Sequence, residues 1–220
     1  MSALKIEVYT DVVCPWCLIG CHRLDNVLAR DFSGIDVDIE HHPVMLIPDC
    51  PPDGLKIADL LIARYGRYDP VAMRARPEAE ARAAGITLDM TRQPMFYPTL
   101  AAHTLIRMAR PLGSQHRLST ALATAYFIDG LNIGDVEILS GIAEKFGFDR
   151  HQIRRQLAST VELDETRRAA AISASRGVRS VPHVVIDGQA APAQDEATLA
   201  ASICAMRSRA ASRQSARSTT

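Results

Sequence analysis

The sequence feature that most constrains the fold is a cysteine pair placed where the hydrophobic period changes. Residues 4–8 alternate apolar and polar side chains, which is typical of a half-buried strand. From Cys14-Pro-Trp-Cys17 onward, apolar residues recur every three or four positions as far as about Arg30, as on one face of a helix. Residues 35–39 alternate strictly again. The pair is therefore expected at the first strand-to-helix turn of a βαβ unit.

The middle of the chain has a helical period almost throughout, from Pro48 to about Arg176. Pro77 is expected to kink or break one of these helices, because proline lacks the N–H that an inner turn needs. After this block, residues 178–186 are rich in β-branched side chains, Asp187-Gly188 suits a turn, and residues 196–206 can form a closing helix. The helices of the middle block are expected at residues 57–65, 70–85, 98–109, 114–128, 135–146, 149–157 and 161–176.

These patterns predict an α/β protein in which one domain interrupts another. Residues 1–47 and 177–207 would together form a discontinuous domain that contains the strands. Residues 48–176 would form an inserted helical domain. The last residues, 208–220, carry arginine but no acidic side chain and are otherwise mostly small and polar, so we expect a disordered tail.

Composition and charge exclude several classes of function. The 220 residues include 25 basic and 25 acidic side chains, so no net field would attract nucleic acid or an anionic membrane. No apolar run approaches the roughly 18 residues that a membrane-spanning helix needs. The first residues resemble a strand more than a secretion signal. Five unevenly spaced cysteines are too few for a secreted disulfide scaffold, and we expect a cytoplasmic protein.

The cysteine pair is typical of thiol redox chemistry. A cysteine at a helix N-terminus is stabilised as the reactive thiolate by free backbone N–H groups and the helix dipole. Two intervening residues leave the second sulfur within reach of a disulfide. We expect Cys14 to be the exposed nucleophile and Cys17 the buried, resolving thiol. Such chemistry needs no metal and no organic cofactor.

Other interpretations of the cysteines remain open from the residues alone. A zinc-binding interaction module could recruit Cys14, Cys17, Cys21 and His22 as ligands. Against this, tetrahedral zinc sites usually draw their ligands from two separate pieces of chain. Cys21 is better explained as a packing residue on the apolar face of the helix, and Cys50 and Cys204 have no indicated role.

Four segments together resemble the DsbA family of thiol-disulfide oxidoreductases, and within it the cytoplasmic FrnE-like branch. They are residues 11–20, 102–107, 125–135 and 177–186, which span nearly the whole chain apart from the tail. The resemblance implies a thioredoxin-like fold with an all-helical domain inserted after the second strand. It also implies that Val181-Pro182 lies opposite the cysteine pair, with Pro182 in the cis form that proline tolerates.

The resemblance further implies a disulfide oxidoreductase or isomerase that acts through Cys14 and Cys17. Its partners would be protein or small-molecule disulfides and thiols, glutathione among them, with no nucleic acid and no membrane. Asp11 lies three residues before Cys14, close enough to tune the pair or relay a proton to it, but it could instead form a hydrogen bond with the backbone at a strand end. His103 could be an ordinary buried or surface histidine. The expected supporting residues of the site are Pro15, Trp16, Asp11, Val181 and Pro182, with His103 in the substrate groove.

The chain departs from the family pattern at three places, and a rival family is similar. Cys21 stands where a basic residue is expected, Pro77 interrupts a helix, and the strand after Ile186 should be short. The rivals are 2-hydroxychromene-2-carboxylate isomerases and kappa-class glutathione transferases, which resemble residues 11–13, carry serine in place of Cys14 and use bound glutathione. Serine chemistry needs no second thiol, so Cys17 favours the oxidoreductase.

Overall fold

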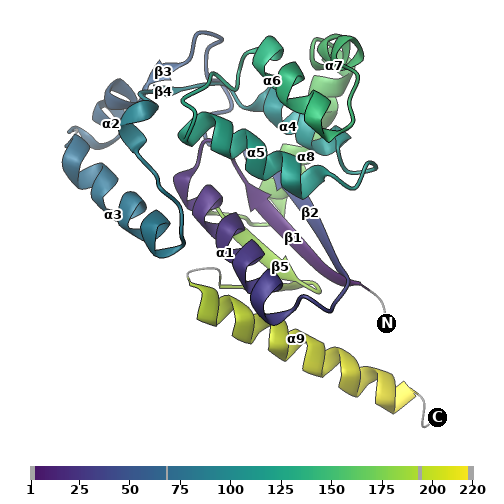
Figure 1. Ribbon diagram of the computed structural model, residues 1–220. Helices are drawn as coiled ribbons and strands as arrows, with labels where there is room; N and C mark the ends of the chain where they lie inside the picture. Colours follow the sequence, from purple (N-terminus) through teal and green to yellow (C-terminus); the bar gives the residue numbers. More distant parts are fainter. Residues whose placement is uncertain (1–2, 68, 193–194, 218–220) are drawn as a thin grey trace.

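The computed structural model describes residues 3–67, 69–192 and 195–217, which are built on a mixed sheet (Figure 1). Its strands are β1 (Leu4–Thr10), β2 (Val37–Pro43), β5 (His183–Ile186) and β6 (Gln189–Ala191). Their order in the sheet is β2-β1-β5-β6. β1 and β2 run parallel, whereas β5 is antiparallel to both of its neighbours, β1 and β6. A parallel pair needs a crossover connection, and the helix after the cysteine pair supplies it.

Two helices pack on one face of the sheet and enclose a first hydrophobic core. Helix α1 (Pro15–Asp31) connects β1 to β2, and α9 (Glu196–Arg217) follows β6. Asn26 and Arg30 of α1 donate to the Glu196 carboxylate at 2.9 and 2.6 Å, which fixes α9 against α1. Apolar side chains of the sheet and of both helices form this core, among them Leu4, Ile6, Val8, Leu24, Val27, Val184, Ile186, Leu199 and Ile203.

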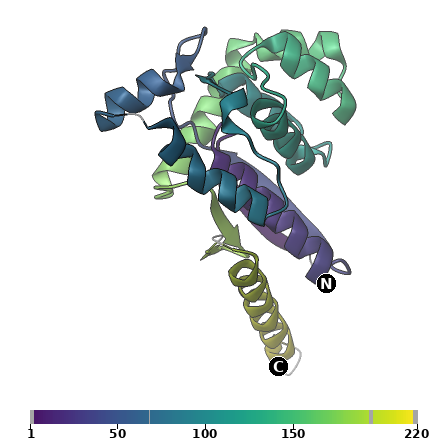
Figure 2. The same ribbon diagram turned by 60° about the vertical axis from the view of Figure 1, so that its left-hand side comes forward.

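The other helices lie between β2 and β5 in the sequence and form two groups (Figures 1 and 2). One group is α2 (Ile57–Tyr65) and α3 (Pro70–Ala83). The other is α4 (Leu100–Met108), α5 (Gln115–Phe127), α6 (Val136–Ala143), α7 (Arg150–Leu157) and α8 (Thr160–Ser175). These helices enclose a second core, to which Leu18 and Ile19 of α1 also contribute. The N-terminal turns of α1 therefore lie where the two cores meet.

The expected helices of the middle block are all present, with ends shifted by a few residues. Helix α3 begins at an Asp69 cap and continues through Pro77, so of the kink or break expected there, the break is wrong. Pro77 is buried, and its packing offsets the missing backbone hydrogen bond. The insert is also not wholly helical, because β3 (Leu55–Lys56) pairs with β4 (Met95–Phe96). Two-residue strands leave no detectable alternation in a sequence.

The C-terminal helix is longer than the sequence suggests. α9 continues to Arg217, so the expected disorder is wrong for residues 208–217. Alanine and arginine are good helix formers, and a helix already nucleated by packing extends at little cost. In the described part of the chain, α9 and the other helices are too short or too polar to cross a bilayer. The predicted domains and tail also include residues 1–2, 193–194 and 218–220, which lie outside the described residues.

Gly20 allows α1 to lie against the segment that precedes β5. A Cβ at this position would lie 2.8 Å from Cγ of Pro182, closer than carbon atoms of neighbouring side chains approach. We predict that Gly20→Ala destabilises the protein by about 1–2 kcal/mol, since overlap with a rigid ring outweighs the gain in helix propensity. Urea unfolding followed by circular dichroism measures the change.

Gly141→Ala in α6 is the matched control, because nothing lies within 4 Å of a Cβ built there. This variant should gain about 0.5–1 kcal/mol of stability from helix propensity. Equal effects of the two substitutions would show that Gly20 does not set the distance between α1 and Pro182.

Candidate functional site

The cysteine pair lies on the first turn of α1, just after β1. Cys14 is the N-cap with extended backbone (φ −93°, ψ 116°), and Pro15 is the first helical residue. The N–H groups of Cys17 and Leu18 donate to the Cys14 carbonyl at 3.0 and 3.3 Å. Pro15 suits its position because an N–H there would have no partner. Cys14 therefore lies at the positive end of the helix dipole, and Cys17 lies one turn further in.

The pKa values of the two thiols shift in opposite directions. A hydrogen bond from the Cys17 thiol lowers the pKa of Cys14, against desolvation and the nearby Asp11 carboxylate, which raise it. Burial raises the pKa of Cys17 well above its usual value, and its hydrogen bond to Cys14 adds to the rise. Cys14 is therefore the thiol that ionises first.

Cys14 is more enclosed than the sequence suggests. The residue is 5 % exposed, close to the 3 % of Cys17, so the expectation of an exposed nucleophile is wrong. The segment before β5 covers it, and the Val181 carbonyl oxygen lies 3.9 Å from the Cys14 Sγ. The peptide bond between Val181 and Pro182 is cis, as the sequence predicts. The dithiol thus faces the backbone of this segment.

Asp11 and His103 form a buried pair close to the dithiol. Nε2 of His103 lies 3.3 Å from Oδ1 of Asp11, and the Leu46 N–H donates to Oδ2 at 2.8 Å. Asp11 therefore accepts a hydrogen bond from the backbone, as the alternative interpretation held. Its carboxylate also raises the pKa of Cys14. His103 lies in the interior and outside the cavity beside the dithiol, so its expected place in a substrate groove is wrong.

A cavity of about 720 Å³ opens beside the dithiol. Arg23 of α1 and Glu80 of α3 form an ion pair of 2.5 Å in its wall. The Arg76 guanidinium lies over the Trp16 ring, 5.2 Å from its centroid. The volume is in the range of small-molecule sites and is large enough for a short piece of peptide. The lining residues are Trp16, Arg23, Arg76, Glu80, Ser180, Val181, Pro182, His183, Ala191, Pro192 and Asp195.

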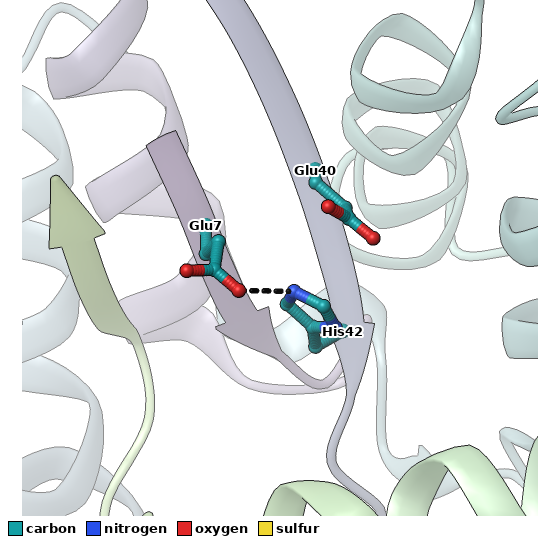
Figure 3. A group of neighbouring side chains, drawn as sticks. All are labelled: Glu7, Glu40 and His42. Carbon is teal, nitrogen blue, oxygen red and sulfur yellow. Dashed lines mark hydrogen bonds and ion pairs between the residues drawn. The ribbon is translucent and has the colours of Figure 1, made fainter. Parts of the chain in front are cut away.

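The four ligands of the zinc interpretation do not converge. A possible metal site needs at least three ligand-type side chains whose ligand atoms lie within 4.8 Å of one another. Within residues 3–67, 69–192 and 195–217, Glu7, Glu40 and His42 form such a group, and the four residues of the zinc interpretation do not. Figure 3 shows this group on β1 and β2, with Glu7 and His42 bonded at 3.1 Å. Lys5 pairs with Glu40 at 3.1 Å, and Arg176 pairs with Glu7 at 3.3 Å. The cluster is therefore an ion-pair network on the sheet.

The remaining cysteines lie outside the Cys14–Cys17 pair. Cys21 packs in the core between the sheet and α1, as the sequence predicts, and burial raises its pKa to about 12. The Cys50 Sγ lies 3.6 Å from the Phe96 carbonyl oxygen. Cys204 is exposed on α9. All five cysteines are free thiols in this structure.

Sequence reasoning missed the charged wall of the cavity. Arg76 and Glu80 lie one turn apart on α3, and the helix carries charged residues over most of its surface. Periodicity therefore could not show which side of α3 faces Trp16. The contact joins two segments that are far apart in the sequence, and no local signal marks it.

Comparisons with known proteins agree with this geometry. The family model described as a DSBA-like thioredoxin domain matches residues 5–203. YwbO of Bacillus subtilis, an uncharacterized protein, is 27% identical over 166 residues, which are 76% of this chain and 78% of YwbO. The crystal structure of a probable DsbA oxidoreductase from Streptomyces coelicolor has a TM-score of 0.79 at 26% identity, covering 91% of this chain and 88% of that chain.

A 2-hydroxychromene-2-carboxylate isomerase shares the fold, with a TM-score of 0.69 at 15% identity over 96% of this chain and 98% of that chain. The family match begins in β1 and ends in α9, so it includes the dithiol turn, the inserted helices and the segment before β5. The thioredoxin-like fold with a helical insert is confirmed, and the chain belongs to the family of DSBA-like thioredoxin domains.

Proposed function

We propose that the chain is a thiol-disulfide oxidoreductase of the FrnE-like branch, and that it acts through Cys14 and Cys17. The observation that carries the proposal is the asymmetry of the pair. The Cys17 thiol lowers the pKa of Cys14 at the start of a helix, while burial keeps Cys17 protonated. Membership of the family supports thiol-disulfide chemistry in general. The direction of electron flow depends on the reduction potential of the Cys14–Cys17 pair relative to that of the thiols and disulfides around the protein.

In the reducing direction, the Cys14 thiolate attacks one sulfur of a substrate disulfide. The substrate S–S bond breaks, a mixed disulfide forms with Cys14, and the other substrate sulfur leaves as a thiolate. That thiolate takes the proton of Cys17, and the resulting Cys17 thiolate attacks the Cys14 sulfur. The bond between Cys14 and the substrate breaks, and the second substrate sulfur leaves as a thiolate that takes its proton from water. The substrate gains two electrons, and the protein loses them as the Cys14–Cys17 disulfide forms. The reverse sequence of steps oxidises two substrate thiols to a disulfide. If another thiolate of the substrate attacks the mixed disulfide and displaces Cys14, the substrate disulfide is isomerised.

The supporting residues have distinct roles in this scheme. Val181 and Pro182 present backbone beside the Cys14 sulfur, where an extended substrate segment can pair with it. Pro15 starts the helix, and Trp16 forms a wall of the cavity. Asp11 is a positioning residue, because its carboxylate ties the turn after β1 to distant parts of the chain.

A glutathione-dependent isomerase or transferase is the second candidate. The likeness of the fold to 2-hydroxychromene-2-carboxylate isomerase favours it. Against it, that chemistry leaves Cys17 without a role, although the Cys17 thiol is the largest cause of the lowered pKa of Cys14. We place the activity in the cytoplasm, where disulfides of proteins are kept reduced and glutathione is an available small thiol.

We predict that the two active-site variants fail at different steps. Cys14→Ser should abolish reduction of insulin disulfides, because the attacking thiolate is gone. Cys17→Ser should still attack but accumulate a mixed disulfide, with turnover lower by a factor on the order of 100. Insulin turbidity measures turnover, and intact mass spectrometry detects the adduct.

Cys204→Ser is the control for these variants, since this exposed thiol lies on α9, away from the dithiol turn, and its loss should leave turnover unchanged. Full turnover of Cys17→Ser with glutathione as the thiol donor would contradict the dithiol mechanism. The glutathione-dependent candidate would then be preferred.

The lowered pKa of Cys14 predicts how its alkylation depends on pH. Iodoacetamide reacts with the thiolate, so the wild-type rate should stay high below the usual pKa of cysteine, about 8.5, and decline as Cys14 is protonated. Cys17→Ala removes the donated hydrogen bond and should move the midpoint to higher pH. Cys17→Ser keeps a donor and should stay closer to wild type.

The measurement is the rate of alkylation against pH, with Cys14→Ser as the blank. An identical midpoint in wild type and Cys17→Ala would show that the start of the helix alone stabilises the Cys14 thiolate.

The reduction potential of the pair should lie between those of thioredoxin and DsbA, about −270 to −120 mV. The contacts that lower the pKa of Cys14 are hydrogen bonds from Cys17 and from the Trp16 backbone, so the stabilisation of the thiolate is moderate. Equilibration with glutathione buffers, followed by alkylation and mass analysis, measures the potential. A value as oxidising as that of DsbA would require a further stabiliser of the reduced form.

A further inference from the structure

The cavity beside the dithiol has room for groups attached to a substrate disulfide. Trp16 stands between the two cysteines in the chain, and Val181, whose carbonyl oxygen is 3.9 Å from the Cys14 sulfur, lines the same space. A disulfide that reaches Cys14 from this side therefore places its neighbouring atoms against the cavity wall. The charges of that wall then act on the substrate at short range.

Most charged groups of the wall already have partners. Arg23 and Glu80 neutralise each other in an ion pair of 2.5 Å. Asp195 accepts hydrogen bonds from the N–H and the hydroxyl of Thr198, at 2.7 and 3.0 Å, at the start of α9. These groups have little capacity left for a substrate charge.

Arg76 is the exception among the charged groups of the wall. Its guanidinium has no hydrogen bond and no ion pair to the described part of the chain, and its contact is with the face of the Trp16 ring. Stacking on a ring uses the flat face of the guanidinium and leaves the N–H groups at its edge free to donate. An unneutralised arginine is therefore held against Trp16, the second residue after Cys14, with its donors available.

We infer that the cavity selects disulfides that carry a carboxylate within a few bonds of the sulfur, and that Arg76 determines this specificity. The edge of a guanidinium matches the two oxygens of a carboxylate, which can accept two parallel hydrogen bonds. The inference rests on the proposed dithiol chemistry and adds its substrate class. Acidic peptides with cystine and small anionic disulfides share this chemistry.

The test uses three disulfides of the form S–CH₂–CH₂–X that differ in charge. They are 3,3′-dithiodipropionate (anionic), 2-hydroxyethyl disulfide (neutral) and cystamine (cationic). The measured quantity is the rate at which each oxidises the fully reduced protein, from acid-quenched samples and mass analysis, with Cys14→Ser as the blank. Each rate is divided by that of the same disulfide with 2-mercaptoethanol, which removes differences in intrinsic reactivity.

We expect the normalised rate of the anionic disulfide to exceed that of the neutral one by about three- to fivefold, the size of an exposed ion pair. The cationic disulfide should be slowest, and added salt should reduce the differences. Arg76→Gln should abolish the preference, because it slows the anionic disulfide more than the neutral one. Arg76→Lys should keep part of it, because the charge remains.

Arg82→Gln is the matched control, since it removes the same charge from the same helix at a residue outside the cavity wall. Its preference should equal that of wild type. Equal normalised rates in wild type, an unchanged preference in Arg76→Gln, or equal slowing of all three disulfides by Arg76→Gln would each overturn the inference. Failure of the neutral disulfide to oxidise the pair would instead overturn the proposed function.

Discussion

The buried carboxylate of Asp11 is the interaction on which the position of the dithiol depends. A buried carboxylate is costly unless it is paired, and this one is bonded by the Leu46 N–H and by His103. Leu46 follows β2, and His103 belongs to α4. The Asp11 carbonyl in turn accepts from the Cys14 N–H at 3.1 Å. The position of Cys14 therefore depends on contacts from both the sheet and the inserted helices.

The same dependence explains why the site lies where two hydrophobic cores meet. The sheet, α1 and α9 share one core, and the inserted helices share the other with Leu18 and Ile19 of α1. The first part supplies the cysteines and the backbone of Val181. The insert supplies α3, which brings Arg76 to the ring of Trp16. In the proposed function, chemistry and substrate preference are thus divided between the two parts of the fold.

Local features were predictable from the sequence, and long-range contacts were not. The dithiol turn and the Asp69 cap follow from short-range backbone preferences, and the family resemblance adds the cis form of Pro182. The pairing of Asp11 with His103 joins residues 92 positions apart, which no periodicity reports. The burial of Cys14 depends on a segment from the other end of the chain. At Pro77, packing outweighed a local rule, and after residue 207, extension of a helix did so.

The nearly equal burial of the two cysteines shows what makes them different. Desolvation raises the pKa of both thiols, so burial alone would leave neither reactive. At Cys17 desolvation is the largest cause of the raised pKa, whereas at Cys14 the hydrogen bond from the Cys17 thiol, helped by the backbone N–H groups of Cys17 and Trp16, outweighs it. That hydrogen bond favours an anion at Cys14 and a proton on Cys17. In the proposed mechanism, the Cys14 sulfur carries no charge once it has entered a mixed disulfide, and it then accepts this hydrogen bond weakly. The hydrogen bond then no longer raises the pKa of Cys17. Desolvation still raises it, and it remains the barrier to the step in which Cys17 attacks the mixed disulfide.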